Sequence, residues 1–318
     1  TKSYFVTVPK GAKALQVIAE VSRARGDAGA AFDALNQANA ILVRQHGADP
    51  RQVQVLENLG INAYWIGQLH KDRNDLASAE TAWRQYLQFA DRLHALEPGK
   101  VAWWIEQSSA HNNLGSLAQA RGQPALAAAA FTASIALKRR ALQHAGDDSS
   151  LTAELADSYA WLASARQSQG QLQEAGRLQQ LALELVRGLR ARFPGEAMWV
   201  NREVHALQQR ATLLLALGED DAAYANTATA AALLAKVARD DPQNRRWQVE
   251  LANIELDLLK LKARRQPPAT LLPEFARVHA TLEAAHRLDP RNAQWATSEA
   301  VARGKLGAAL LAAGDSAR

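Results

Sequence analysis

The sequence predicts an all-α fold, a solenoid in which pairs of antiparallel helices repeat every 48 residues. Two series of residues mark this period. Prolines fall 48 residues apart or at twice that spacing, with Gly146 at the point where one is missing: Pro50, Pro98, Pro194, Pro242 and Pro290. Glycines recur 24 residues away from these points: Gly26, Gly122, Gly170, Gly218 and Gly314. Two repeats have Asn74 and Gln266 at this place instead. A fixed period of this length indicates stacked supersecondary units rather than one globular core.

The composition favours helices in each of these units. Hydrophobic residues make up 48% of the chain, and alanine and leucine supply much of that share, whereas aromatic residues make up only 6%. Alanine and leucine are among the best helix formers. Runs of β-branched residues are scarce. We therefore expect helices and no sheet.

The third repeat, residues 98–145, shows how each unit divides into two helices. Apolar residues recur at helical spacing on both sides of Gly122. Gly122 suits the left-handed conformation that ends many helices, and Pro124 suits the first turn of the helix that follows. Each repeat is therefore predicted to be a hairpin of two helices, each about 20 residues and about 30 Å long.

Three positions in the repeat resemble the tetratricopeptide repeat (TPR), whose unit of about 34 residues carries an L-G pair, a small residue and a bulky residue at fixed spacing. The L-G pair reads Ile66-Gly67, Leu114-Gly115, Leu162-Ala163 and Leu306-Gly307. The small residue is Ala31, Ala79, Ala127, Ala175 and Ala223. The bulky residue is Leu35, Trp83, Phe131 and Phe275.

Measured against the TPR pattern, each helix is longer by about seven residues, or two turns. An insertion of one heptad nearly restores the helical phase, so the same faces stay buried. The chain thus resembles a long-helix variant of the TPR, of a kind seen in bacterial multidomain proteins.

The resemblance implies one right-handed superhelix over residues 1–318, without a domain boundary. Its repeats would cover residues 2–49, 50–97, 98–145, 146–193, 194–241 and 242–289, followed by a single last helix in 290–318. Residues 1–8 read as an extended lead-in. The chain begins with Thr1 rather than methionine, and we expect it to be an excised or processed piece.

Tryptophans recur at a position of the lengthened first helix that the usual TPR pattern does not mark. Trp103, Trp199, Trp247 and Trp295 each lie five residues after the start of a repeat, and Val55 and Leu151 take this place in two others. A tryptophan can bury about 150–250 Å². We expect this series to pack each first helix against the preceding repeat.

Several classes of function lack any support in the sequence. The net charge of +5 is modest and the basic residues are spread along the chain, whereas nucleic-acid binders gather them in a stripe, so we expect no nucleic-acid partner. The chain has no cysteine, which excludes disulfides and thiolate metal sites but fits either the cytoplasm or the periplasm. No apolar run reaches the roughly 20 residues of a membrane helix. Phosphate loops, zinc spacings and nucleophile elbows are absent, so we expect no enzyme, no cofactor and no metal.

The most promising surface is the inner face of the first helices, which lines the concave side of TPR proteins. Carried over repeat by repeat, the resemblance places amides, hydroxyls and aromatic rings there: Tyr64, Trp65, Gln68, Asn112, Asn113, Ser116, Trp161, Ser164, His205, Gln208, Gln209 and Thr212. Amide side chains can both donate to and accept from a peptide backbone. Trp65 and Trp161 could supply apolar anchors. The alternative interpretation is that these polar residues only face water.

Three hypotheses of function follow. The first is a non-catalytic scaffold that holds a protein or an extended peptide in its concave groove. The second is a ligand-sensing or regulatory domain of a larger bacterial signalling protein, whose effector domain lies outside this chain. The third is self-assembly, in which a homodimer forms through one edge or through the unpaired last helix.

Overall fold

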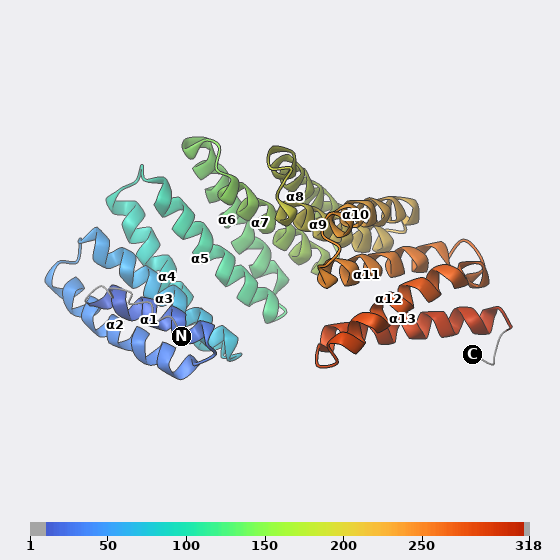
Figure 1. Ribbon diagram of the computed structural model, residues 1–318. Helices are drawn as coiled ribbons and strands as arrows, with labels where there is room; N and C mark the ends of the chain where they lie inside the picture. Colours follow the sequence, from blue (N-terminus) through green and yellow to red (C-terminus); the bar gives the residue numbers. More distant parts are fainter. Residues whose placement is uncertain (1–10, 315–318) are drawn as a thin grey trace. The chain divides into compact units, whose positions relative to one another are not determined.

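The computed structural model describes residues 11–314, and every regular element in this range is a helix (Figure 1). The prediction of an all-α fold built from helix hairpins is confirmed. The lead-in predicted for residues 1–8 lies outside the described residues. The elements are α1 (Ala12–Ala24), α2 (Ala28–Ala48), α3 (Val53–Asp72), α4 (Leu76–Leu96), α5 (Val101–Ala120), α6 (Pro124–Ala145), α7 (Ser149–Ser168), α8 (Leu172–Arg192), α9 (Ala197–Ala216), α10 (Asp220–Asp240), α11 (Arg245–Lys262), the 3-10 helix η1 (Pro268–Leu271), α12 (Leu272–Leu288) and α13 (Ala293–Ala312).

The helices fall into two compact units, which we call the N-terminal unit, up to Gly170, and the C-terminal unit, from Gln171. In each unit, sequence neighbours pack as hairpins, such as α3 with α4 and α5 with α6 in the first, and α9 with α10 in the second. The boundary between the units lies within the repeat 146–193, between its two helices. A single continuous solenoid over residues 1–318 stays a prediction.

The turn inside the hairpins explains the glycine series. Gly122 has φ +68°, the left-handed conformation in which a side chain is strained. The amide of the next residue, Gln123, donates to the carbonyl of Ala118 at 2.9 Å, which closes the end of α5. Asn74, which stands in place of a glycine, has φ 60°. Asparagine is among the few other residues that tolerate this conformation, so the turn is kept. Pro124 occupies the first turn of α6, as predicted.

The small and bulky positions of the repeat form the centre of each hairpin. The five alanines at the small position are completely buried: Ala31, Ala79, Ala127, Ala175 and Ala223. The bulky Phe131 lies against Gly115, where an added Cβ would come within 2.6 Å of the ring, and the ring of Trp83 lies even closer to Gly67. At Gly67 and Gly115 the glycine is therefore needed because a ring from the second helix occupies the space of its side chain.

The additional tryptophans pack as expected. Trp103 is buried and clusters with Leu56 of α3 and Leu93 of α4, both in the preceding repeat. Its indole N–H donates to Glu97 Oε2 at 2.9 Å. This hydrogen bond is the main cause that lowers the pKa of Glu97 below its usual range. Trp247 is only half-buried and packs against the cluster that contains Leu183 and Leu234. The series thus fastens the extra turns of the first helices to the helices before them.

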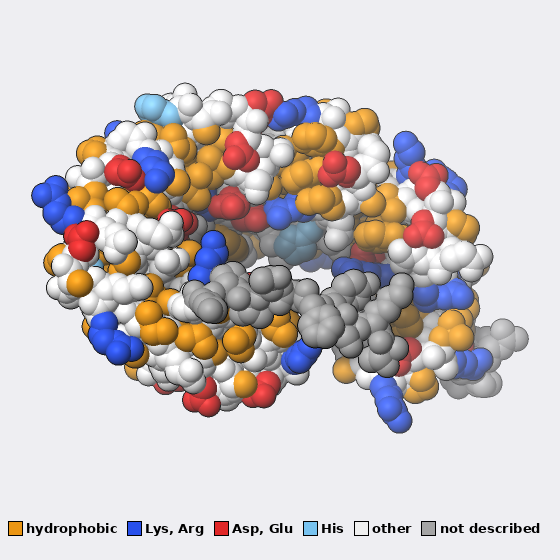
Figure 2. All heavy atoms as spheres, turned by 60° about the vertical axis from the view of Figure 1, so that its left-hand side comes forward, with side chains coloured by type: hydrophobic (Ala, Val, Ile, Leu, Met, Phe, Trp, Pro, Cys, Tyr) orange, Lys and Arg blue, Asp and Glu red, His pale blue; other side chains and the backbone are white. Residues whose placement is uncertain are grey.

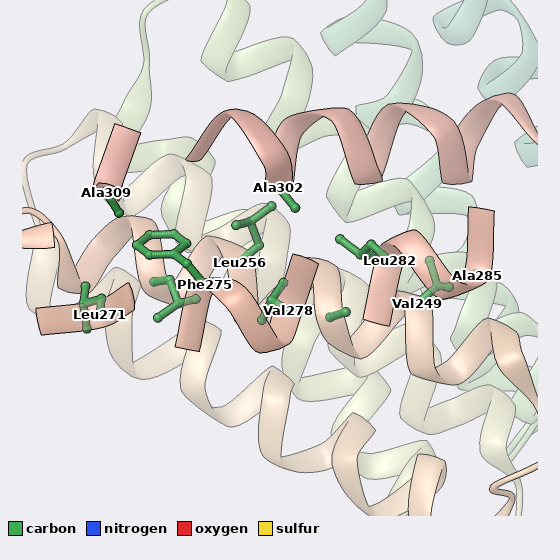
Figure 3. Close-up of a cluster of buried hydrophobic side chains, with 11 residues drawn as sticks. Val249, Leu256, Leu271, Phe275, Val278, Leu282, Ala285, Ala302 and Ala309 are labelled. Carbon is green, nitrogen blue, oxygen red and sulfur yellow. The ribbon is translucent and has the colours of Figure 1, made fainter. Parts of the chain in front are cut away.

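The C-terminal unit has its own core, in which α12 lies between α11 and α13 (Figure 3). Phe275 and Val278 of α12 and Leu256 of α11 belong to one buried cluster, and Ala302 and Ala309 supply the side chains of α13 in it.

The surface of the described residues mixes the two signs of charge. Lys and Arg side chains alternate with Asp and Glu over the face in view in Figure 2. No helix in residues 11–314 is both long and apolar enough to cross a membrane.

Candidate binding groove of the N-terminal unit

A groove of about 400 Å³ opens on the N-terminal unit, and most of its lining comes from the first helices of three successive repeats. Helices α3, α5 and α7 supply its walls, and α4 and α6 each contribute one side chain from the second helices. The lining residues are Ile61, Tyr64, Trp65, Tyr86, Glu106, Ser109, Asn112, Asn113, Lys138, Glu154, Asp157 and Trp161.

Aromatic rings form one side of this groove. The ring of Tyr64 makes edge contacts with Trp65, at a centroid distance of 4.9 Å, and with Tyr86, at 5.8 Å. Burial is the main cause that raises the pKa of Tyr64 above its usual range, so its hydroxyl stays protonated. Trp161 stands near Phe131 with a centroid distance of 5.9 Å and leaves 44% of its surface exposed. A tryptophan of this kind offers a flat apolar face to a ligand.

A hydrogen-bond network closes the groove floor and is centred on the buried hydroxyl of Ser158. This oxygen accepts from Asn112 Nδ2 at 3.2 Å and from Lys138 Nζ at 3.1 Å, and it donates to the carbonyl of Glu154 at 2.9 Å. Lys138 is only 1% exposed, and its Nζ also lies 3.4 Å from Glu154 Oε2. Burial lowers the pKa of Lys138, and the charge of Glu154 opposes this shift. The ammonium is held in place by the protein itself.

Carboxylates provide most of the charge in the groove. The hydroxyl of Tyr86 donates to Glu106 Oε2 at 2.5 Å. Burial raises the pKa of Glu106 above its usual range, and the charges of Glu57 and Glu154 raise it further, while the bond from Tyr86 lowers it. The pKa of Tyr86 is also raised, first by burial and then by the charge of Glu106. The hydroxyl therefore acts as a fixed donor.

Five of the side chains predicted from the sequence line this groove, although they are not equally accessible. Tyr64, Trp65, Asn113 and Trp161 reach its surface, whereas Asn112 is only 7% exposed and its amide is bound to Ser158. Asn112 therefore holds helices α5 and α7 together.

Three other predicted residues of the N-terminal unit do not line the groove. Each already has a hydrogen-bond partner elsewhere in the same unit. Gln68 Nε2 donates to Asp72 Oδ1 at 2.7 Å. Ser116 Oγ accepts from Lys71 Nζ at 3.3 Å, and Ser164 Oγ accepts from Gln119 Nε2 at 2.6 Å. Each of these hydrogen bonds occupies a side chain that the sequence analysis predicted to face a ligand.

The remaining four predicted residues belong to α9 of the C-terminal unit. His205, Gln209 and Thr212 are exposed and Gln208 is half-buried. Thr212 Oγ1 donates back to the carbonyl of Gln208 at 3.1 Å. These four residues thus lie on one face of α9 and do not line the groove.

The sequence prediction missed part of the lining for an identifiable reason. Ser109 and Asp157 lie four residues before Asn113 and Trp161, and Glu106 and Glu154 lie seven residues before them. These are the additional helical turns, which the ordinary TPR pattern does not contain. Extending the repeat toward the start of each first helix would have found them. Tyr86 and Lys138 come from second helices, which the prediction did not consider.

Within residues 11–314, no three His, Asp or Glu side chains converge in a way that could hold a metal ion.

Comparisons with known proteins agree on the fold. No protein-family model matches the sequence, and no curated protein matches it. Among solved structures, a signal transduction ATPase with a tetratricopeptide repeat sensor, from Pyrococcus horikoshii, matches with a TM-score of 0.56 and 12% identity, over 95% of this chain and 43% of that chain. The apo form of RapI matches with a TM-score of 0.52 and 10% identity, over 92% of this chain and 98% of that chain. A putative kinesin light chain from Podosopora anserina, with TPR-like repeats, matches with a TM-score of 0.50 and 20% identity, over 71% of this chain and 96% of that chain.

The fold is that of tetratricopeptide-repeat proteins. The resemblance first drawn from the L-G, alanine and ring positions is confirmed at the level of the fold. Because all three identities are low, the likeness establishes the architecture alone.

Proposed function

We propose that this chain is a protein-interaction scaffold and that the groove of the N-terminal unit holds an extended peptide. The observation that carries the proposal is the exposed ring of Trp161, which lines the same groove as Asn113, a residue with an amide donor that lacks a partner among the described residues. The Nδ2 atom of Asn113 is shielded from solvent and has no hydrogen-bond partner among the described residues. A buried donor left in this way is costly, and rotation of the Asn113 side chain toward the groove would let it donate to a peptide carbonyl.

The size and shape of the groove also suit a peptide. A volume of about 400 Å³ accommodates a few side chains. The lining alternates rings with amide and hydroxyl groups, so it can take apolar side chains and backbone groups of the same ligand. Trp161 and Trp65 are of the residue type that dominates binding hot spots.

The test uses peptides of about twelve residues selected from a random display library against the whole protein. We expect Trp161→Ala combined with Asn113→Ala to weaken binding of the selected peptides by about tenfold or more, because a hot-spot residue commonly contributes this much. The matched control is Leu126→Ala, which removes an apolar side chain that is 60% exposed on α6 and lies outside the groove. Peptides that bind the double variant as well as the parent would refute the proposal. Asn112→Ala is unsuitable as a probe because it breaks the bond to Ser158.

A ligand-sensing or regulatory role in a larger bacterial signalling protein is the second candidate. It is favoured by the match to the Pyrococcus horikoshii protein, since that protein is described as carrying a TPR sensor and the match covers 43% of its chain. Hydrogen exchange with and without a selected peptide separates the two roles. A sensor requires protection to change in helices beyond those that line the groove, whereas a scaffold requires protection only at the groove.

A further inference from the structure

A second groove, of about 550 Å³, lies on the C-terminal unit between α8 and α9. Gly176, Arg177, Gln180 and Leu181 of α8 line it, together with Arg210 of α9. Leu181 leaves 41% of its surface exposed. The lining therefore combines an exposed leucine with two arginines, and it contains no carboxylate.

The repeat pattern marks Arg210 as a departure. It occupies the leucine place of the L-G pair, which holds an isoleucine or a leucine in every other repeat: Ile18, Ile66, Leu114, Leu162, Leu258 and Leu306. An apolar residue here packs against the second helix of the preceding repeat, as Ile66 does in the cluster of Leu35 and Leu306 does in the cluster of Phe275. A guanidinium at a packing position carries a desolvation cost that a leucine does not. The packing role of this position therefore does not account for the arginine.

The space beside Arg210 is left open by Gly176. The two residues are neighbours, since Arg210 Nη1 donates to the carbonyl of Gly176 at 3.3 Å. A Cβ added at Gly176 would meet a single atom within 4 Å, Cδ2 of Leu213 at 3.8 Å. Other repeats carry a side chain at this place: Phe32, Glu80, Ala128, Tyr224 and Leu272. The glycine thus leaves a hollow next to the one arginine of the L-G series.

Arg210 brings a charge to the groove that no carboxylate of the protein balances. Its guanidinium forms no ion pair with a carboxylate of residues 11–314, and its hydrogen bond to a backbone carbonyl uses one of the several N–H groups that a guanidinium carries. Arg177, by contrast, pairs with Glu174 at 3.1 Å. Glu184, which lies outside the lining, accepts from Gln180 at 2.8 Å. Arg210 is therefore the group in this groove that is left to bind an anion.

We propose that the groove between α8 and α9 is a second binding site, which takes an acidic side chain and a neighbouring apolar side chain of a protein partner. A guanidinium donates two parallel hydrogen bonds to a carboxylate. Leu181 and the hollow at Gly176 provide apolar contact for the second side chain. A free anion such as phosphate would use Arg210 but leave Leu181 in water. The site shares no residue with the groove of the N-terminal unit.

The probe is the tetrapeptide acetyl-Ala-Glu-Leu-Ala-amide, titrated into the whole protein and followed by NMR at the Nε–H of Arg210 and the backbone amide of Gly176. One matched peptide has glutamine in place of glutamate, and another has alanine in place of leucine. We expect a saturable shift with the first peptide and about tenfold weaker binding of each matched peptide, because a charge-assisted hydrogen bond and a buried leucine side chain each contribute about that factor. Added sodium chloride should weaken the glutamate peptide more than the glutamine peptide.

Arg210→Leu tests the protein side of the same contact. The variant restores the residue that Leu162 represents in the preceding repeat, so it should stay folded, and thermal denaturation checks this. Followed at the amide of Gly176, it should bind the glutamate peptide about tenfold more weakly and no longer distinguish it from the glutamine peptide. Arg287→Leu is the matched control, since Arg287 is an exposed arginine of the same unit that is ion-paired with Glu283. It should leave binding unchanged.

Several results would overturn the inference. Absence of a saturable shift with the glutamate peptide is one, and equal binding of the glutamate and glutamine peptides by the parent protein is another. Unchanged binding by Arg210→Leu would show that the arginine is not the anion contact. Equal binding of the peptide with alanine in place of leucine would reduce the groove to a site for any anion and refute the protein partner. These results are independent of the proposed function, which is tested at Trp161 and Asn113.

Discussion

The two units are built from the same 48-residue repeat pattern. They differ in the residues at the inner face of the first helices and at the centre of each hairpin. The place occupied by Trp65, Asn113 and Trp161 in the N-terminal unit is taken in the C-terminal unit by residues that are exposed and mostly charged: Gln209, Asp257 and Lys305. The same helical position therefore supplies rings and an amide to a groove in one unit and solvated side chains in the other.

The hairpin centres differ in a related way. In the N-terminal unit a ring packs over the glycine of the L-G pair, as Phe131 does over Gly115. In the C-terminal unit the matching residues of the fifth repeat are Ala211 and Thr227, and the glycine in α13, Gly307, has nothing within 4 Å of its Cβ position. The difference shows that the repeat sets the positions of the helices, while the side chains at a few positions determine how tightly a hairpin is filled and whether it can bind.

The largest expected effect concerns the tryptophan series. Trp103→Ala should cost about 3–5 kcal/mol, because Trp103 is buried between the first helix and the preceding repeat. Trp247→Ala, at the same repeat position in the C-terminal unit, should cost about half as much, because Trp247 is half-buried. Chemical denaturation measures both. Equal losses would show that the two units depend on this position to the same degree.

A smaller effect is expected from the glycines of the L-G pair. Gly115→Ala places a methyl group 2.6 Å from the buried ring of Phe131 and should cost about 1–3 kcal/mol. Gly307→Ala is the matched control, and it should be neutral or stabilising by about 0.5–1 kcal/mol, because its position is open and alanine favours the helix. If both substitutions had the same sign, the ring would not be what excludes a side chain at Gly115.

The smallest effect depends on pH and concerns Glu106. Burial raises its pKa in the folded state, so between the usual glutamate pKa and the raised value the folded protein holds more protons than the unfolded chain. Stability is therefore lost as pH rises through this window. Glu106→Gln should raise the melting temperature at about pH 8 and lose this advantage at about pH 4.

Glu184→Gln, at an exposed carboxylate that accepts from Gln180, is the control for this pH dependence. Its melting temperature should follow that of the parent at both pH values. A destabilised Glu106→Gln variant at pH 8 would contradict the assigned cost of the buried charge.

The sequence predicted much of the architecture because the repeat recurs in one phase. The prolines and glycines located the hairpins, and the buried alanines such as Ala79 and Ala127 are at the places that the pattern gave. These signals are local, since a turn or a helix contact depends on residues close in the chain.

The candidate site was predicted only in part because it depends on contacts between repeats. Asn112 was expected to face a ligand, but its amide reaches Ser158, which lies 46 residues further along the chain. Lys138 was overlooked because a lysine on a second helix is ordinarily solvated, and only the packing of α6 against α7 buries it. The boundary between the compact units lies directly after Gly170, and nothing in the glycine series distinguishes this glycine from its equivalents in the other repeats.

The most direct test of the account is to locate a bound peptide by the indole N–H signals of the tryptophans in the whole protein. A library-selected peptide should shift the signals of Trp65 and Trp161, which line the groove, and leave those of Trp199 and Trp247 in the C-terminal unit unchanged. Shifts at Trp199 or Trp247 without any at Trp65 and Trp161 would contradict the claim that the groove of the N-terminal unit is the binding site.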